Sequence, residues 1–423
     1  MQTILNPARS EWDRLCERNI PDDSAIEKTV EEIIANVREN GDKALLDYAR
    51  RFDRYEGTSL IVSDDDIEKA AAKVRPEVAD AIRKAAANIE AFHKAQLPQP
   101  VEVETVEGVR CVQRAVPITR VGLYIPGGRA PLFSTVLMLA IPARIAGCRE
   151  VILCTPENGE TGIAPEILFA AKLCGIHKVF RIGGAQAVAA MAFGTESVPA
   201  VHKIFGPGNR FVTKAKQIVS RQTAIDMPAG PSEVMVVADQ TANPTFVAAD
   251  MLSQAEHGPD SQAIAVCQSE KQAEEIRAEV ERLADMLPRR DSIEGSLSHS
   301  RIIVLPKMET MIDFANAYAP EHLILSVENP WERAAEITAA GSVFIGNYSP
   351  ESAGDYASGT NHTLPTSGWA RSFSGVNIDS FMHKITYQEL TREGLGLLAD
   401  VITTMARAEG LDAHALAVTV RSE

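Results

Sequence analysis

The sequence has no excess of basic residues and no long apolar run. Lys and Arg total 42 against 57 Asp and Glu, which gives a formal net charge of −15. Because a phosphate backbone binds to a basic face, we expect no nucleic-acid partner. The longest apolar run, 136–143, contains Pro142, is followed by Arg144 and is too short to cross a bilayer. We therefore expect no membrane span either.

The sequence also lacks the apolar segment of a secretory signal, since charges run through its first residues. The six cysteines are scattered and form no C-x-x-C pair, and none is beside a histidine or in a nucleophile turn. This usage is typical of reduced, buried thiols in a cytoplasmic protein, and a catalytic thiol is the weaker alternative. The cysteines are Cys16, Cys111, Cys148, Cys154, Cys174 and Cys267.

A chain of 423 residues is too long for one ordinary core. Helical spacing of apolar residues predicts helices within 23–52, with a break at Gly41, and over 77–95, and 101–112 predicts a hairpin. Beyond it, β-branched runs alternate with helical segments, which is typical of an α/β chain with largely parallel sheets. The predicted strands are 121–125, 151–154, 178–182, 202–205, 234–238, 263–267, 302–305, 323–327 and 343–345.

Nine strands exceed one compact sheet, so we divide them between two α/β domains. The first is predicted to combine residues 23–120 with 234–380, and the second, 121–233, is then an insertion. Residues 1–22 form an N-terminal extension. Residues 381–423 form a C-terminal arm with a helix over 390–422.

Glycine turns follow three of the predicted strands, at Tyr124–Gly128, Ile182–Ala187 and Phe205–Asn209. Glycine lets the backbone approach a ligand closely, and a strand-to-helix turn directs free N–H groups at a phosphate. Any one of them alone is more often a tight turn, but three in one domain indicate a shared ligand cleft. The G-x-G-x-x-G fingerprint is absent, so a dinucleotide would bind in a non-standard manner.

Possible metal ligands occur in three separate segments. Gln254 and His257 are three residues apart in a segment that reads as helical, so we expect them on one face, although a hydrogen-bonded helix surface is the commoner explanation of such a pair. Imidazole, amide and carboxylate groups can bind a divalent metal. Later potential ligands are Asp355, His362, Glu409 and His414.

Two further segments carry groups suited to acid–base chemistry. Ser232 follows Pro231 at a rigid turn, where its hydroxyl can face a cleft, although a turn former is the usual role. Glu321 and His322 are adjacent at the start of a predicted strand. They can act as a carboxylate that activates water and an imidazole that shuttles protons. The alternative is a surface carboxylate beside a hydrogen-bonded edge histidine.

Eight segments in order resemble the motif series of the histidinol dehydrogenase family over nearly the whole chain. The resemblance implies an α/β fold of two incomplete Rossmann-like domains (aldehyde-dehydrogenase-like) with small helical N- and C-terminal extensions. It also implies a zinc-dependent oxidation of L-histidinol to L-histidine through the aldehyde, with two NAD, in a homodimer. The segments are YIPGG, GGAQA, FGPGN, DMPAGPSE, LSQAEHGPDSQ, APEHL, ESAGDYASGTNH and EGLDAHA.

The resemblance also implies roles for individual residues. One Zn²⁺ per subunit would be held by Gln254, His257, Asp355 and His414 of the partner subunit, so the arm would reach the partner. Glu321 and His322 would be the catalytic pair. NAD would lie in the 121–233 domain, against Tyr124, Gln186 and Asn209. The substrate would contact Ser232, His362, Glu409, His322 and the zinc ligands.

The implied mechanism needs no cysteine. His322 would take the hydroxyl proton as the first hydride leaves, and Glu321 would activate the water that attacks the aldehyde. Two alternatives are weighed against it. Some relatives oxidise other small polar alcohols, including sulfonated diols, but Glu409 suits an imidazole ring. A metal-dependent dimer or binding protein without activity is disfavoured, because every expected acid, base and ligand is retained.

Overall fold

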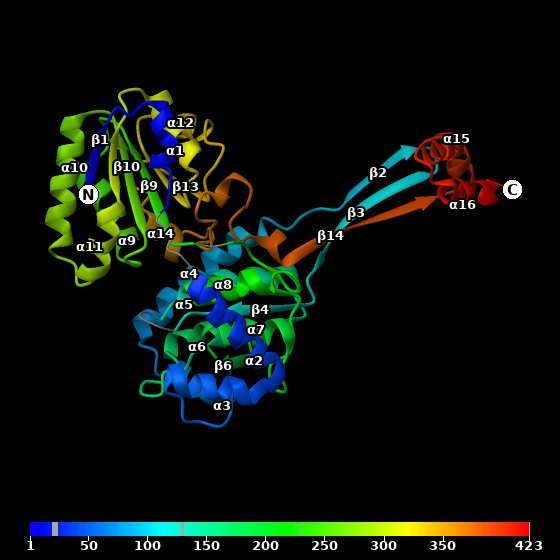
Figure 1. Ribbon diagram of the computed structural model, residues 1–423, viewed down its shortest axis with the longest axis horizontal. Helices are drawn as coiled ribbons and strands as arrows, with labels where there is room; N and C mark the ends of the chain where they lie inside the picture. Colours follow the sequence, from blue (N-terminus) through cyan, green and yellow to red (C-terminus); the bar gives the residue numbers. More distant parts are fainter. Residues whose placement is uncertain (19–23, 128–130, 229, 423) are drawn as a thin grey trace.

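The computed structural model describes residues 1–18, 24–127, 131–228 and 230–422. Two parallel sheets form two α/β domains, and a third, antiparallel sheet belongs to an arm that extends away from both (Figure 1). Gly128 of the first glycine turn and Ala229 before Ser232 lie outside the described residues. All nine strands predicted from the sequence are confirmed, and the parallel pairing within both domains is confirmed as well.

The six-stranded sheet buries both of its faces. Val234 and Val236 of β9 pack against one group of helices, whereas Met235 and Val237 pack against another group on the opposite face. This is why its strands read as continuous apolar runs. In order across the sheet the strands are β1 (Gln2–Leu5), β11 (Arg301–Val304), β10 (Gln262–Cys267), β9 (Glu233–Ala238), β12 (His322–Ser326) and β13 (Ser342–Ile345). The helices are α1 (Trp12–Leu15), α9 (Pro244–Ala255), α10 (Glu270–Ala284), α11 (Arg290–His299), α12 (Met308–Tyr318), α13 (Pro330–Ala334) and α14 (Glu351–Tyr356).

The five-stranded sheet is also covered on both faces. Ile152 and Cys154 pack toward α2, α7 and α8, while Leu153 between them packs toward α4, α5 and α6. The strands in order are β6 (Lys178–Arg181), β5 (Glu150–Thr155), β4 (Arg120–Tyr124), β7 (Lys203–Phe205) and β8 (Ala224–Ile225). The helices are α2 (Ser24–Tyr48), α3 (Asp64–Ala71), α4 (Pro76–Lys94), α5 (Phe133–Ala146), α6 (Pro165–Leu173), α7 (Gly184–Phe193) and α8 (Arg210–Val219).

The helices within residues 24–94 were predicted to belong with residues 234–380, but they lie on the other sheet. Helices α2, α3 and α4 cover the five-stranded sheet, so residues 24–94 pack mainly with 121–225. Helix α4 also reaches the other domain, where the Asn88 amide donates to the Ala357 carbonyl at 2.8 Å. Within the predicted extension 1–22, residues 2–5 form β1, an edge strand paired with β11. The apolar spacing identifies the buried face of each helix, but it does not identify the sheet that covers it. The predicted break at Gly41 is confirmed by its φ of +50° within α2.

The arm has two components that are distant in sequence. The hairpin β2 (Val101–Val106) and β3 (Val109–Pro117) pairs with β14 (Met382–Leu390), which was not predicted. The single helix predicted over 390–422 is two helices, α15 (Arg392–Ala408) and α16 (Asp412–Ser422), and they pack against each other. Large apolar side chains on them stay exposed, including Leu397, Met405 and Leu416. None of the described helices combines the length and apolarity that a bilayer span requires.

Candidate active site

Most of the predicted site residues gather where the two domains touch. Strands β9, β10 and β12 begin at this edge of the six-stranded sheet, and β4 of the five-stranded sheet ends there. Thr135 on α5 lies 3.3 Å from Nε2 of His362 through its hydroxyl. The Asn361 amide donates to the Met138 carbonyl at 2.6 Å. The site therefore combines the amino edge of one sheet with the carboxyl edge of the other.

Glu321 and His322 sit at the entrance of β12, as predicted, and both are buried. Ala319, in the left-handed region at φ +55°, reverses the chain just before them. One oxygen of Glu321 accepts the Glu233 backbone N–H at 2.9 Å. Nδ1 of His322 lies 3.2 Å from the Glu233 carbonyl, which can only accept, so this nitrogen carries the proton. The pair is thus fixed against the start of β9.

Gln254 and His257 come from the end of α9 and the turn after it. The helix ends at Ala255, so the expectation that both residues are helical is wrong for His257, whose N–H donates to the Gln254 carbonyl at 3.2 Å. The Gln254 side chain is fully buried, yet within the described residues neither its oxygen nor its nitrogen has a hydrogen-bond partner. A buried amide without partners is unfavourable, which is what a ligand or cation would relieve.

Helix α14 adds two carboxylates to the same place. Ligand atoms of His257, Glu351 and Asp355 all lie within 4.8 Å of one another. Oδ1 of Asp355 is 3.7 Å from Nε2 of His322. Glu351 was not singled out from the sequence, although its i,i+4 spacing to Asp355 puts both on one helix face. This set of imidazole and carboxylate groups, with the unpartnered Gln254 amide, fits a zinc ion.

The ionisable groups in this cluster shift one another's pKa values. Burial lowers the pKa of His322, but Glu351, Glu321 and Asp355 outweigh it and raise the pKa to about 10. Burial raises the pKa of Glu321 and of Glu351 to about 8 each, against the opposing effect of His322. Burial also opposes ionisation of Asp355, but His322 holds its pKa below the usual value. The site is therefore an acidic cluster that a divalent cation would neutralise.

Ser232 and His362 border this cluster. His362 directs Nδ1 at the Asp355 backbone carbonyl, 3.0 Å away, and burial lowers the pKa of its ring. Ser232 immediately precedes Glu233, and its carbonyl accepts from Gln262 at the start of β10. Arg18 pairs with Glu233 at 2.7 Å, so a residue from the N-terminal segment braces the same turn.

The residues predicted to bind NAD lie at the carboxyl edge of the five-stranded sheet. The Tyr124 hydroxyl accepts the Gly184 N–H at 3.2 Å, and Gln186 is buried beside it on α7. Asn209 begins α8, where its side chain accepts from the N–H groups of Phe211 and Val212. The glycine turns and helix starts are thus brought to one edge.

A buried ion pair fixes one of these turns. Lys216 contacts Asp226, and both side chains are almost completely buried. Lys216 donates to the Gly206 carbonyl at 2.9 Å, while Asp226 accepts the Gly206 N–H at 2.8 Å. Gly206 has φ +125°, and a Cβ there would lie 2.1 Å from the Tyr124 carbonyl oxygen. The turn therefore needs glycine and is held by side chains on either side of it.

Two predicted site residues are not with the others. Glu409 and His414 are exposed on the arm, which extends away from the two domains (Figure 1). Within one chain they cannot join His257 and Asp355.

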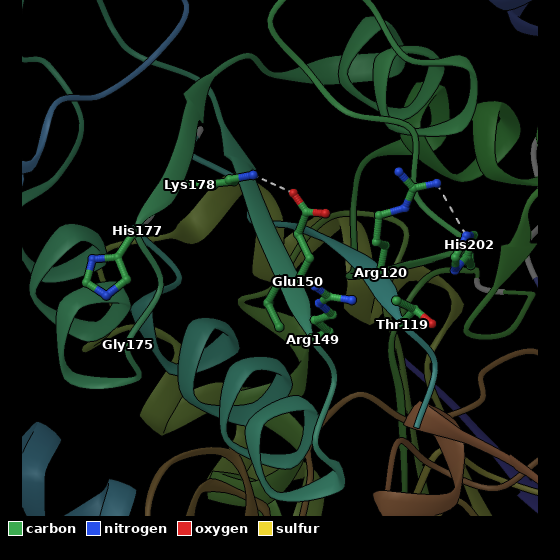
Figure 2. A pocket seen from close by; sticks show the side chains of 9 residues that line it. Thr119, Arg120, Arg149, Glu150, Gly175, His177, Lys178 and His202 are labelled. Carbon is green, nitrogen blue, oxygen red and sulfur yellow. Dashed lines mark hydrogen bonds and ion pairs between the residues drawn. The ribbon is translucent and has the colours of Figure 1, made fainter. Parts of the chain in front are cut away.

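A separate cavity of about 650 Å³ lies at the opposite, amino edge of the five-stranded sheet (Figure 2). It is lined mainly by polar and charged side chains, some of which neutralise each other. Lys178 pairs with Glu150 at 2.5 Å, and Arg120 lies 3.4 Å from His202. No predicted site residue lines it, so this cavity is distinct from the candidate active site.

The family model described as histidinol dehydrogenase matches residues 16–422. The chain belongs to this family. It is 55% identical to the histidinol dehydrogenase of Bacteroides fragilis, covering 100% of this chain and 99% of that protein. It is 53% identical to that of Salmonella typhimurium, covering 94% and 91%. The crystal structure of histidinol dehydrogenase from Elizabethkingia anophelis matches with a TM-score of 0.97 and 51% identity, covering 100% of this chain and 98% of that one.

Proposed function

We propose that this chain oxidises L-histidinol to L-histidine through L-histidinaldehyde, transferring two hydrides to two NAD, with a zinc ion in the site. The observation that carries the proposal is the meeting of Glu321, His322, His257 and Asp355 around buried polar groups that lack partners. Membership of the family supplies the substrate. The reaction is the final step of histidine biosynthesis.

We infer that zinc is held by Gln254, His257, Asp355 and His414 of the partner subunit. The unpartnered Gln254 amide and the acidic cluster support a resident cation. When bound, the ion would act as a Lewis acid that orients the amino alcohol and stabilises negative charge on the substrate oxygen. Ser232, His362 and Glu409 complete the substrate contacts in this proposal.

His322 performs the first proton transfer. Its Nδ1 is directed at the Glu233 carbonyl, so Nε2, which is buried and without a hydrogen bond in the described residues, is the nitrogen that would accept the substrate hydroxyl proton. Against the effect of burial, the carboxylates around the ring raise its pKa to about 10, so a divalent cation that neutralised them would lower this pKa and leave Nε2 unprotonated. The O–H bond breaks as the carbinol hydrogen leaves as hydride to the first NAD. The product of this step is the aldehyde.

Glu321 performs the second proton transfer. Its carboxylate takes a proton from water while the water oxygen bonds to the aldehyde carbon. The hydrated aldehyde then gives its hydride to the second NAD and becomes the carboxylate. Burial favours a group that can change protonation near neutral pH, since it raises the pKa of Glu321 to about 8.

We propose that NAD lies against Tyr124, Gln186 and Asn209. Three strand-to-helix turns meet at this edge, which is where doubly wound sheets bind dinucleotides. The exposed apolar side chains of α15 and α16 support a homodimer with shared sites. The buried free thiols support a reducing, cytoplasmic location.

The deciding experiment is a stoichiometry measurement on the purified protein. We expect two NADH per L-histidinol consumed, lost after chelation and recovered when zinc is restored. Dihydroxypropanesulfonate assayed in parallel should give a far lower kcat/KM. A metal-loaded protein that binds histidinol and forms no NADH, or that prefers the sulfonate, would overturn the proposal.

A further inference from the structure

Glu351 is a buried carboxylate that the proposed mechanism does not use. Its side chain is 1% exposed, and neither oxygen has a hydrogen-bond partner among the described residues. A buried carboxylate without donors is strongly unfavourable, so the fold keeps it there against its own stability. A buried polar group without partners at the edge of a site indicates a functional role.

The backbone around Glu351 is tightly held. Burial raises the pKa of Asp250 on α9 to about 7, against the opposing effect of the Glu351 backbone beside it. Gly354, one turn along α14, lies so close to β13 that a Cβ there would be 2.8 Å from the Phe344 ring. The direction of the Glu351 side chain is therefore set by the packing of α14 between α9 and β13.

The nearest charged partner of Glu351 is the ring of His322. Its Oε1 lies 3.8 Å from His322 Nδ1. Glu321 lies at a similar distance, 3.6 Å, but its nearer oxygen already accepts the Glu233 N–H. Glu351 is thus the carboxylate beside Nδ1 that has no hydrogen-bonded partner in the described residues.

We propose that Glu351 is a positioning residue for His322, an inference that rests on the proposed function. The Glu233 carbonyl accepts from Nδ1, and the charge of the Glu351 carboxylate, 3.8 Å from the same nitrogen, favours a proton there, so the ring stays turned with Nε2 toward Asp355. Nε2 is then the nitrogen that meets the substrate hydroxyl. Carboxylates that orient catalytic or metal-bound imidazoles act in this way in many enzymes.

The competing role for Glu351 is that of a metal ligand, because its oxygens also lie near His257 and Asp355. The two roles predict different losses. A ligand variant loses metal, whereas a positioning variant keeps metal and loses turnover. The measurement of bound zinc therefore separates them.

The experiment compares Glu351→Ala and Glu351→Gln with the wild type and with the control Glu309→Gln, an exposed carboxylate that also begins a helix. We expect Glu351→Ala to lower kcat about 10- to 100-fold, with KM for histidinol and NAD changed less than about threefold. Bound zinc and the melting temperature of Glu351→Gln should match the control. Glu351→Gln should retain more turnover than Glu351→Ala, because its amide fills the same space and its oxygen keeps a partial negative charge beside Nδ1.

A double variant tests whether Glu351 acts through His322. In a His322→Asn background, Glu351→Ala should reduce the residual rate by less than about twofold, since the residue it orients is gone. As a second readout, the ¹⁵N signals of the His322 ring should shift from the Nδ1–H form in Glu351→Ala and not in Glu309→Gln.

Loss of zinc in Glu351→Gln, full activity in Glu351→Ala, or equal losses in both backgrounds would overturn the positioning role. A wild type that forms no NADH from histidinol would instead overturn the proposed function, which is a different outcome of the same assays.

Discussion

The two edges that meet at the candidate site are built in opposite ways. At the amino edge of the six-stranded sheet, Glu351, His322 and Gln254 are buried with atoms that have no partner in the described structure. At the carboxyl edge of the five-stranded sheet, the charged groups Lys216 and Asp226 are paired and hold a glycine turn. The first edge keeps side chains available for a metal and a substrate. The second edge is satisfied internally and offers backbone to a cofactor.

This difference predicts which substitutions should impair catalysis and which should impair stability. Changes at the first edge should abolish chemistry and leave folding intact, or even improve it, since buried unpaired charges are destabilising. Changes at the second edge should weaken the fold and NAD binding together. The predictions below run from the largest expected effect to the smallest.

The sharpest test concerns the part of the site that one chain cannot supply. We expect His257→Asn and His414→Asn each to lower turnover about a thousandfold, because several kcal/mol of charge stabilisation are lost with the metal. Mixing the two variants under conditions that exchange subunits should restore about a quarter of wild-type activity. Random pairing makes half of the dimers mixed, and one of their two sites then has both histidines.

The control for this experiment is a mixture of His257→Asn with Asp355→Asn, which lie in the same domain. That mixture should stay inactive, because each variant lacks a ligand in its own domain. Every site in every dimer then lacks either His257 or Asp355, whichever arm it receives. Activity without mixing, or equal recovery in both mixtures, would contradict the shared site.

The second prediction separates the two members of the catalytic pair. His322→Asn should lower both oxidations by about 10²- to 10⁴-fold, the usual contribution of a general base. Glu321→Gln should reduce oxidation of added histidinaldehyde far more than formation of the first NADH. Single-turnover measurements with histidinol and with the aldehyde distinguish the steps. Equal losses at both steps in Glu321→Gln would sink the proposed division of roles.

The third prediction concerns the paired edge. Asp226→Asn leaves Lys216 buried without its counter-charge, so we expect a loss of about 3–5 kcal/mol in the free energy of unfolding. The freed Gly206 turn should also raise KM for NAD while KM for histidinol changes little. Denaturant unfolding and steady-state kinetics check both.

The matched control is Lys172→Met, which removes an exposed pair with Glu68 in the same domain. It should alter stability by less than about 1 kcal/mol. If Asp226→Asn behaves like this control, the buried pair has no special role in holding the turn.

The local parts of the fold were predictable from the sequence, and the long-range packing was not. Nine β-branched runs identified nine strands, because buried parallel strands are apolar on both faces. Helix α2 has one apolar face that fits either sheet equally well, so its placement required the structure. Strand β14 was missed because its side chains are mostly exposed and show no apolar alternation.

The same limit applies to the site. Glu321 and His322 are sequence neighbours and were found together, while their approach to Asp355 depends on how α14 packs. Glu351 could have been found from its i,i+4 spacing to Asp355, but a carboxylate at a helix start is normally exposed. Glu409 and His414 stand apart in one chain, so their role follows only from the family resemblance and a second subunit.

The smallest effects are expected for the cysteines, none of which has a role in the proposed chemistry. Burial raises the pKa of Cys148, Cys174 and Cys267 to about 12 each, so these thiols stay protonated and poorly nucleophilic near neutral pH. Replacing each of the six cysteines by Ser or Ala should change kcat less than about twofold. The variants at the fully buried Cys154 and Cys267 should lose some stability, so melting temperatures are measured with the rates. A variant that folds normally and is inactive would mean that a thiol takes part in aldehyde oxidation, and Glu321 would then lose its assigned role.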